Sequence, residues 1–276
     1  MEFRRYDNVE AFSSDVLGIL LKNEILNNLS ISILTESKAR YTADWLMATV
    51  TDNGLITHAA LYTKPFDLLL YESDSHRQDG MELLAANIKR LGIDPPGVFA
   101  ERGLAWRFAN AYDSGRAPAQ IKTLIVMRLD KLAEYHKAPG YCRALDARDL
   151  YFVPYWERSF SEECRTHVFP IPDLVGRISA RLNKGSHFIW EDGNPVSQAV
   201  HGRSTPNGAV VNMVYTPPHF RGKGYATSVV AKLSGILLDA GYDFCCLFAD
   251  ACNPVARKVY QNLGYYDVYT YDVIKL

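Results

Sequence analysis

The chain has 276 residues, which is long for one domain and suits two domains of about 100–150 residues each. Hydrophobic residues make up 48% and charged residues 22%, a composition that excludes a disordered chain. The 30 basic and 31 acidic side chains give a net charge of −1, which argues against wholesale nucleic-acid binding through a basic surface and leaves a local basic site open.

The first half predicts a strand meander followed by alternating helices and strands. Residues 43–73 contain apolar, strand-like runs and the dipeptide Asn53-Gly54, which is a strong hairpin-turn signal. Apolar residues then recur at helical spacing in two segments, and each segment is followed by a strand-like run. The predicted order is a helix over 81–93, a strand over 97–102, a helix over 104–112 and a strand over 121–132.

The second half begins with a helix over 173–185, for which Asp173 is the predicted cap and Gly185 the predicted end. Three strands follow over 186–216, joined by turns at Asp192-Gly193 and Asn207-Gly208. After a basic, glycine-containing stretch, the pattern predicts a long helix that ends near Gly241. A buried strand, a short helix with Pro254 in its first turn and a closing strand complete the chain.

The two halves share one order of elements and one spacing. Tyr71 and Tyr215 end corresponding strands 144 positions apart, and Arg77 and Arg221 have the same separation. The sequence therefore predicts a duplicated α/β domain of the α+β type with a mixed sheet. The predicted domains are 1–135 and 145–276.

The stretch Arg221-Gly222-Lys223-Gly224-Tyr225-Ala226 lies between a strand and a helix. A helix N-terminus offers unpaired backbone N–H groups and a partial positive charge, and glycines let the backbone approach a bulky anion. This combination predicts a diphosphate site that needs no metal. It is not a Walker loop, because Gly224 follows Lys223 where that motif requires Ser or Thr. The simpler alternative is a basic structural turn.

The R-x-x-G-x-A pattern at a strand-to-helix junction resembles the acyl-CoA motif of the GNAT N-acetyltransferase superfamily. The segment 253–266, NPVARKVYQNLGYY, resembles the second motif of that family, and the order of elements over 150–276 also agrees. The two-domain layout is similar to that of tandem members such as glycine N-acyltransferases and mycothiol synthase. The resemblance implies two tandem GNAT-like domains.

The first copy departs from this motif. Its aligned loop runs from Arg77 to Glu82, with Gly80 retained, Asp79 added and Glu82 at the small-residue position. Two carboxylates beside a diphosphate would repel it. The sequence therefore predicts that the first domain has lost CoA binding and serves as a scaffold or as one wall of the acceptor groove.

The resemblance also implies roles for individual residues. Backbone groups of Met213, Val214 and Tyr215 would align the pantetheine arm of CoA. The loop from Arg221 through Gly222, Lys223, Gly224 and Tyr225 to Ala226 would hold the diphosphate. Asn253 would contact the cofactor arm, and Tyr260 would protonate the departing thiolate as general acid. For Tyr260 the alternative is an aromatic anchor of the last helix.

The identity of the general base is left open. Glu191 and His201 are candidates, because both lie on strands near the expected acceptor site. Asp250 and a water chain are further alternatives.

The aromatic residues Tyr151, Phe152, Tyr155, Trp156 and Phe160 occur at helical spacing, which favours core packing over an acceptor wall. The seven histidines and five cysteines show no zinc-like spacing, so no metal is expected and the cysteines are predicted to be reduced core thiols.

The resulting hypothesis is an enzyme that transfers acetyl from acetyl-CoA, a co-substrate, directly to a primary amine of a small molecule or peptide. The alternatives are a CoA-binding regulatory or assembly module without turnover, and an acyltransferase that uses a longer acyl-CoA. No nucleic-acid or membrane partner is expected. A cytoplasmic location is expected because no apolar run approaches the ~20 residues that span a bilayer. The sequence leaves the acceptor and the oligomeric state open.

Overall fold

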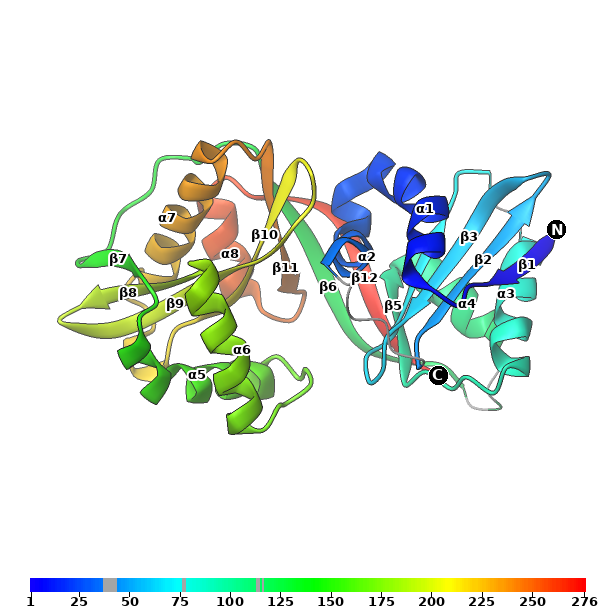
Figure 1. Ribbon diagram of the computed structural model, residues 1–276. Helices are drawn as coiled ribbons and strands as arrows, with labels where there is room; N and C mark the ends of the chain where they lie inside the picture. The colour runs from blue at the N-terminus through cyan, green and yellow to red at the C-terminus, as the bar shows by residue number, and fades with distance from the viewer. Residues whose placement is uncertain (37–43, 76–77, 113–114, 116) are drawn as a thin grey trace. The chain divides into compact units, whose positions relative to one another are not determined.

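The computed structural model describes residues 1–36, 44–75, 78–112, 115 and 117–276 (Figure 1). They form two compact units, one comprising Met1–Val126 with Tyr269–Leu276 and the other Met127–Val268. The division falls inside β6 (Ala119–Leu129) and β12 (Tyr266–Lys275), so both strands contribute residues to each unit. The predicted domain ranges, 1–135 and 145–276, assign all of β6 to the first domain and all of β12 to the second, and they stay a prediction.

The first unit is a mixed sheet with four α-helices among its described residues. Its elements are β1 (Glu2–Arg5), α1 (Val9–Leu20), α2 (Glu24–Glu36), β2 (Leu46–Asp52), β3 (Leu55–Tyr62), β4 (Leu68–Glu72), α3 (Gln78–Arg90), β5 (Gly97–Glu101) and α4 (Arg102–Tyr112). The strands follow the order β1-β2-β3-β4-β5. Neighbours pair antiparallel except β4 and β5, which pair in parallel. Residues Tyr271–Lys275 of β12 pair antiparallel with β5.

The second unit repeats this order of elements. It contains β7 (Tyr141–Ala144), α5 (Val153–Glu163), α6 (Ile171–Lys184), β8 (His187–Asp192), β9 (Asn194–Ser204), β10 (Gly208–Tyr215), α7 (Tyr225–Asp239), β11 (Phe244–Asp250) and α8 (Pro254–Asn262). Its strands follow the order β11-β10-β9-β8-β7, with β10 and β11 parallel and the other pairs antiparallel. The predicted mixed α/β fold class is confirmed.

Local backbone requirements explain the predicted turns. Asn53 and Gly54 both have positive φ, 50° and 80°, as a tight hairpin turn requires. Gly185 ends α6 with φ 62°, as predicted. The predicted cap at Asp173 is wrong, because α6 begins at Ile171 after Pro170. Asp173 instead lies in the first turn, where its negative charge favours the helix dipole.

Helices cover both faces of the sheet in the second unit. One core cluster joins α5 and α6 to β8 and comprises Leu145, Val153, Leu174, Ile178 and Ile189. On the opposite side of β8 and β9 lies α7, whose buried residues include Val229, Leu233 and Leu237 (Figure 1). Side chains alternate along each strand, so Ile189 marks the face of β8 that points toward α6.

Candidate active site

Strands β10 and β11 pair over only part of their length. The parallel ladder joins Gly208, Ala209 and Val210 to Phe244, Cys245 and Cys246. Beyond Val210, β10 continues to Tyr215 and β11 continues to Asp250 without further pairing between them among the described residues. Backbone groups of both strands therefore border an opening at these ends of the strands.

A bulge interrupts β10 beside this opening. The register with β9 shifts between Asn212 and Tyr215, and Met213 has φ 50°. This left-handed conformation costs about 1–2 kcal/mol for a residue with a Cβ. A hydrogen bond of 3.3 Å from Nε2 of Gln198 on β9 to the carbonyl oxygen of Met213 offsets part of that cost. Gln198 therefore supports the bulge from the neighbouring strand.

The glycine-containing loop ends in unpaired backbone donors. Gly222 and Gly224 both have φ 79°, and Gly224 caps α7 without a side-chain cap. The first helical backbone bond runs from Ser228 N–H to the Gly224 carbonyl. In the described chain, no hydrogen bond uses the N–H groups of Tyr225, Ala226 or Thr227. They form the positive end of the α7 dipole and can bind an anion.

The side chains of the loop brace it against its surroundings. Arg221 donates from Nε to the Thr216 carbonyl at 2.8 Å and from one terminal nitrogen to both oxygens of Glu163 at 2.8 Å. Tyr225 is buried and donates to Asp192 at 2.5 Å. Lys223 is exposed. Arg221 and Tyr225 thus fix the loop, and its backbone amides are the groups left available for a ligand.

Residues 192–273 match the family model described as FR47-like protein. No curated protein matches the sequence. A GCN5-related N-acetyltransferase from Sphaerobacter thermophilus matches with a TM-score of 0.70 and 14% identity, over 99% of this chain and 95% of that one. A GNAT-family acetyltransferase from Colwellia psychrerythraea matches with a TM-score of 0.66 and 13% identity, over 100% of both chains.

A tandem GNAT protein from the clavulanic acid biosynthesis pathway also matches, with a TM-score of 0.60 and 13% identity, over 100% of this chain and 98% of that one. The chain has the GNAT fold. At these identities the likeness concerns the fold, and the resemblance inferred from the loop and from residues 253–266 agrees with it. The FR47-like match covers both of those segments.

Asn253 and Tyr260 lie at opposite ends of α8 in this GNAT fold. Asn253 is the exposed N-cap, and its Oδ1 accepts a hydrogen bond from Ala256 N–H at 3.0 Å. Tyr260 is 8% exposed and packs edge-on against Tyr265. Its hydroxyl makes no hydrogen bond within the described chain. Burial raises the pKa of Tyr260 well above its ordinary value, so the phenol stays protonated.

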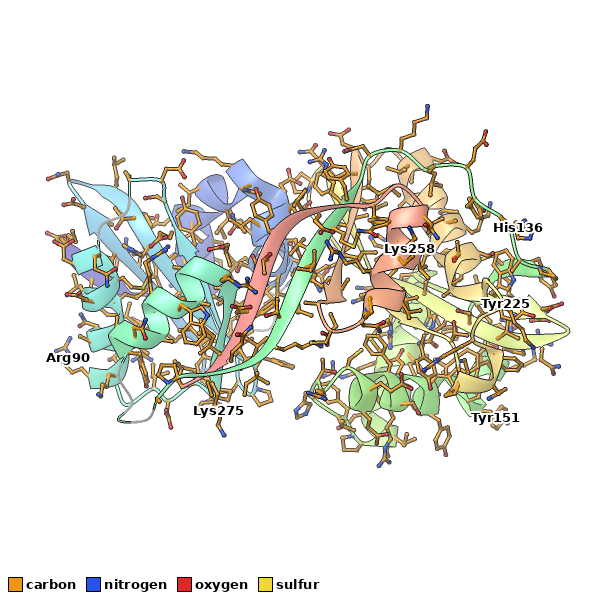
Figure 2. All side chains as sticks on the ribbon, turned by 180° about the vertical axis from the view of Figure 1, so that it is seen from behind. Arg90, His136, Tyr151, Tyr225, Lys258 and Lys275 are labelled. Atoms are coloured by element: carbon orange, nitrogen blue, oxygen red, sulfur yellow. The ribbon has the colours of Figure 1, made fainter. Side chains whose placement is uncertain are left out.

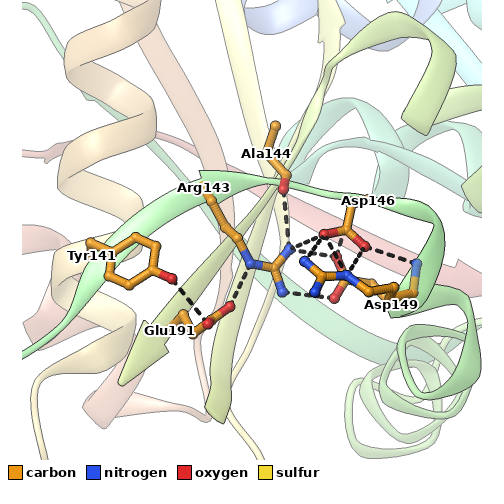
Figure 3. A network of polar contacts seen from close by, with 7 residues as sticks. Tyr141, Arg143, Ala144, Asp146, Asp149 and Glu191 are labelled. Atoms are coloured by element: carbon orange, nitrogen blue, oxygen red, sulfur yellow. Dashed lines mark hydrogen bonds and ion pairs between the residues drawn. The ribbon is translucent and has the colours of Figure 1, made fainter. Parts of the chain in front are cut away.

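Glu191, one of the two base candidates, is held in an ion-pair network (Figure 3). Arg143 contacts it at 2.5 Å, and the Tyr141 hydroxyl donates to it at 3.0 Å. Arg143 also binds Asp149 in a bidentate pair, which ties β7 to the turn before α5. The hydrogen bond from Arg143 lowers the pKa of Glu191. This carboxylate is therefore a weaker base than an unpaired one.

His201, the other candidate, does not meet Glu191. Glu191 shares a strand face with Ile189, toward α6. Val200 pairs with His187 on that same face, so the next residue, His201, points to the opposite side. There its Nε2 lies 2.8 Å from the Ser204 hydroxyl, which lies 2.8 Å from the Tyr242 hydroxyl. The two candidates cannot act on one substrate group together.

The aromatic segment before and within α5 divides into exposed and packed side chains. Tyr151 and Tyr155 are 86% and 58% exposed, so the core packing expected for them is wrong. Figure 2 shows Tyr151 at the edge of the molecule. Phe152 lies against Trp156, whose ring centroid is 6.2 Å from that of Tyr215 at the end of β10. The helix therefore brings Trp156 to the strand that borders the opening.

Sequence reasoning missed a group of buried polar residues behind the bulge. Gln198 and His187 are 0% exposed, and Glu157 of α5 is 2% exposed and forms a 2.5 Å ion pair with Arg181 of α6. A signal was present in the sequence: Gln198 interrupts the apolar centre of β9. Its significance depends on which backbone group it reaches, and that group lies 15 residues further along the chain.

No group of three metal-ligating side chains occurs among the described residues. Nor does any helix in the described ranges have the length and apolarity required to cross a membrane. None of the five cysteines, all of which lie in the described ranges, forms a disulfide. Cys245 and Cys246 are buried, whereas Cys252 is exposed, so the expectation of core thiols is wrong for Cys252.

Proposed function

We propose that the second unit transfers an acyl group, most simply acetyl, from acyl-CoA to a primary amine of a small molecule or peptide. One observation carries the proposal. Strand β10 borders the opening left by β11 and then leads into the loop with unpaired amides. A substrate with a thioester at one end and a diphosphate further along its length suits this succession of backbone groups.

The loop would bind the diphosphate through the amides of Gly222 to Ala226. Gly222 and Gly224 both have positive φ and add no Cβ beside these amides. Lys223 adds a positive charge, whereas Arg221 acts on the loop itself through Thr216 and Glu163. Asn253 would contact the pantetheine arm with the amide nitrogen that its capping bond leaves available.

The bulge would orient the thioester through the backbone of Met213, Val214 and Tyr215. Because a trans peptide directs its C=O and N–H to opposite sides, the bond from Gln198 to the Met213 carbonyl turns the Val214 N–H away from β9. The neighbour of β10 on the side away from β9 is β11, and the ladder between β10 and β11 has ended at this point. We assign to Val214 N–H the donation of a hydrogen bond to the acyl oxygen, whose negative charge grows during transfer.

Tyr260 would protonate the leaving thiolate. Its raised pKa keeps a proton on the phenol, and its hydroxyl is not committed to another partner in the described chain. Neither candidate for the general base is retained. Arg143 neutralises the charge of Glu191. His201 lies on the face of the sheet opposite to Glu191, beside Ser204. We therefore propose that solvent accepts the proton from the amine through water.

The experiment is a screen of primary amines with acetyl-CoA and longer acyl-CoA thioesters, following release of free thiol, with calorimetry of acyl-CoA binding. Amine-dependent thiol release supports the proposal, and the preferred thioester identifies the acyl group. Tight CoA binding without release for any amine would favour a binding module. Absence of binding would overturn the assignment of the loop.

A further inference from the structure

Gln198 is a polar residue at a position that an apolar residue would fill more simply. It is fully buried at the centre of β9, opposite Ile189 of β8 and Tyr215 of β10. A buried carboxamide is unfavourable unless it is hydrogen-bonded. Only its nitrogen meets this condition, through the bond to the Met213 carbonyl, since Oε1 has no partner among the described residues. The hydrogen bond to the Met213 carbonyl therefore accounts for a polar side chain at position 198.

The bond from Gln198 replaces a ladder contact that the bulge removes. The β9–β10 register pairs Asn212 with Val200 and Tyr215 with Gln198, and it leaves Met213 and Val214 without paired residues. Without regular pairing, the Met213–Val214 peptide can rotate. A side-chain donor on its carbonyl fixes its plane and so fixes the direction of the Val214 N–H.

Gln198 has a buried histidine as a neighbour. The His187 ring lies beside it, without a hydrogen bond of good geometry between them. His187 is fully buried and near Arg181, whose own charge is paired with Glu157 at 2.5 Å. His187 of β8 is thus a neighbour of the amide, and the ion pair between α6 and α5 lies beyond this histidine.

We infer that Gln198 is a positioning residue for acyl transfer, which directs the Val214 N–H into the opening between β10 and β11 by binding the Met213 carbonyl. The inference rests on the proposed function. It assigns Gln198 no contact with substrate. Loss of the donor would allow the peptide to turn and would weaken polarisation of the thioester carbonyl.

The test compares the wild type with Gln198→Met, which keeps length and removes the donor. Thr205→Val is the matched control. It removes buried side-chain bonds to Gly208 at the other end of the β9–β10 hairpin, with N–H···Oγ1 3.1 Å and Oγ1···O 3.3 Å. The primary readout is the infrared carbonyl stretch of bound acetyl-CoA labelled with carbon-13 at the carbonyl, which reports polarisation without turnover. Kinetics with the best amine of the screen provide the second readout.

We expect the carbonyl stretch to fall on binding to the wild type and to Thr205→Val, and to fall much less in Gln198→Met. The kcat of Gln198→Met should drop about 10–100-fold while KM for acetyl-CoA changes little. Equal infrared shifts in the wild type and Gln198→Met would overturn this inference alone. Failure of the wild type to bind acetyl-CoA would overturn the proposed function and the inference with it.

Gln198→Glu supplies a pH signature that a purely structural role would not produce. A protonated carboxyl can donate to the Met213 carbonyl, whereas a carboxylate repels it. Activity relative to the wild type should therefore rise as the pH falls. A ratio that stays constant across the pH range in which both proteins are folded would contradict the inference.

Discussion

Gly80 packs directly against the imidazole ring of His58 in the first unit. A Cβ at position 80 would lie 2.7 Å from Cε1 and 2.9 Å from Nδ1 of that ring. The ring is buried, with its Nδ1 3.0 Å from the Thr57 hydroxyl and its Nε2 3.5 Å from Glu72. Gly80 therefore leaves room for His58. Its counterpart Gly224 is a glycine for a different reason, its positive φ.

This contact yields a first prediction. Gly80→Ala should destabilise the protein by about 1–3 kcal/mol, because the added methyl group overpacks a buried ring. The affinity for acetyl-CoA should not change, since the loop of the second unit is untouched. Thermal unfolding and calorimetry check both statements. A stable Gly80→Ala variant with weakened CoA binding would place the cofactor in the first unit. Arg77, which opens the aligned loop, lies outside the described residues.

Gly224→Glu should abolish acetyl-CoA binding, because it places a carboxylate and a Cβ at the unpaired amides of α7. Gly241→Glu is the matched control. Gly241 also has positive φ, 100°, lies beyond the other end of α7 and has open space around it. It incurs similar backbone strain without touching the loop. Calorimetric titration of both folded variants checks this, and equal loss of binding in the two would contradict the loop assignment.

Tyr260→Phe should lower kcat by roughly 10²-fold with little change in acetyl-CoA affinity. The melting temperature should hardly change, because the variant keeps the ring and its edge-on packing against Tyr265. Burial raises its pKa, so the wild-type phenol should remain a proton donor across neutral and mildly alkaline pH. Steady-state kinetics under conditions where chemistry limits the rate check this. An unchanged kcat would leave Tyr260 with a packing role alone.

Glu191→Gln should affect stability more than catalysis. The variant loses the ion pair with Arg143, and kcat should stay within about threefold, whereas removal of a general base costs ~10²–10⁴-fold. Arg143→Gln breaks the same pair from the other side and should have a similar kcat. His201→Gln should likewise retain kcat, because solvent is the proposed proton acceptor and the His201 ring lies beside Ser204, on the face of the sheet away from α6. A large loss in Glu191→Gln alone, with a changed pH–rate profile, would identify Glu191 as the base.

His187 makes acid stability testable. Burial, with the nearby Arg181, lowers its pKa from about 6.5 to about 3. Between these two pKa values, His187 carries a proton in the unfolded chain but not in the folded chain. The free energy of unfolding should therefore fall as the pH drops through this window, by up to about 1.4 kcal/mol per pH unit from this group. Denaturant unfolding at pH 7 and pH 5 should show a smaller loss for His187→Gln. Equal losses would mean that His187 takes up its proton in the folded state.

Local patterns indicated most elements after residue 43 and their repetition, whereas β1, α1 and α2 were not predicted. Positive φ at Asn53, Gly54 and Gly185, and the glycines of the α7 loop, depend on residues adjacent in sequence, so the chain alone indicates them. The repeated order of helices and strands follows from the periodicity of apolar residues in the same way. The segment 253–262 likewise predicted α8 with Pro254 in its first turn.

Only the tertiary structure decided which groups meet. Gln198 reaches Met213, Arg221 binds Glu163 from α5, and β12 pairs with β5 more than 160 residues away. The separation of β10 from β11, and the opposite faces taken by Glu191 and His201, follow from strand register. Register and long-range pairing depend on how the whole chain buries its apolar faces, which no short stretch of sequence specifies.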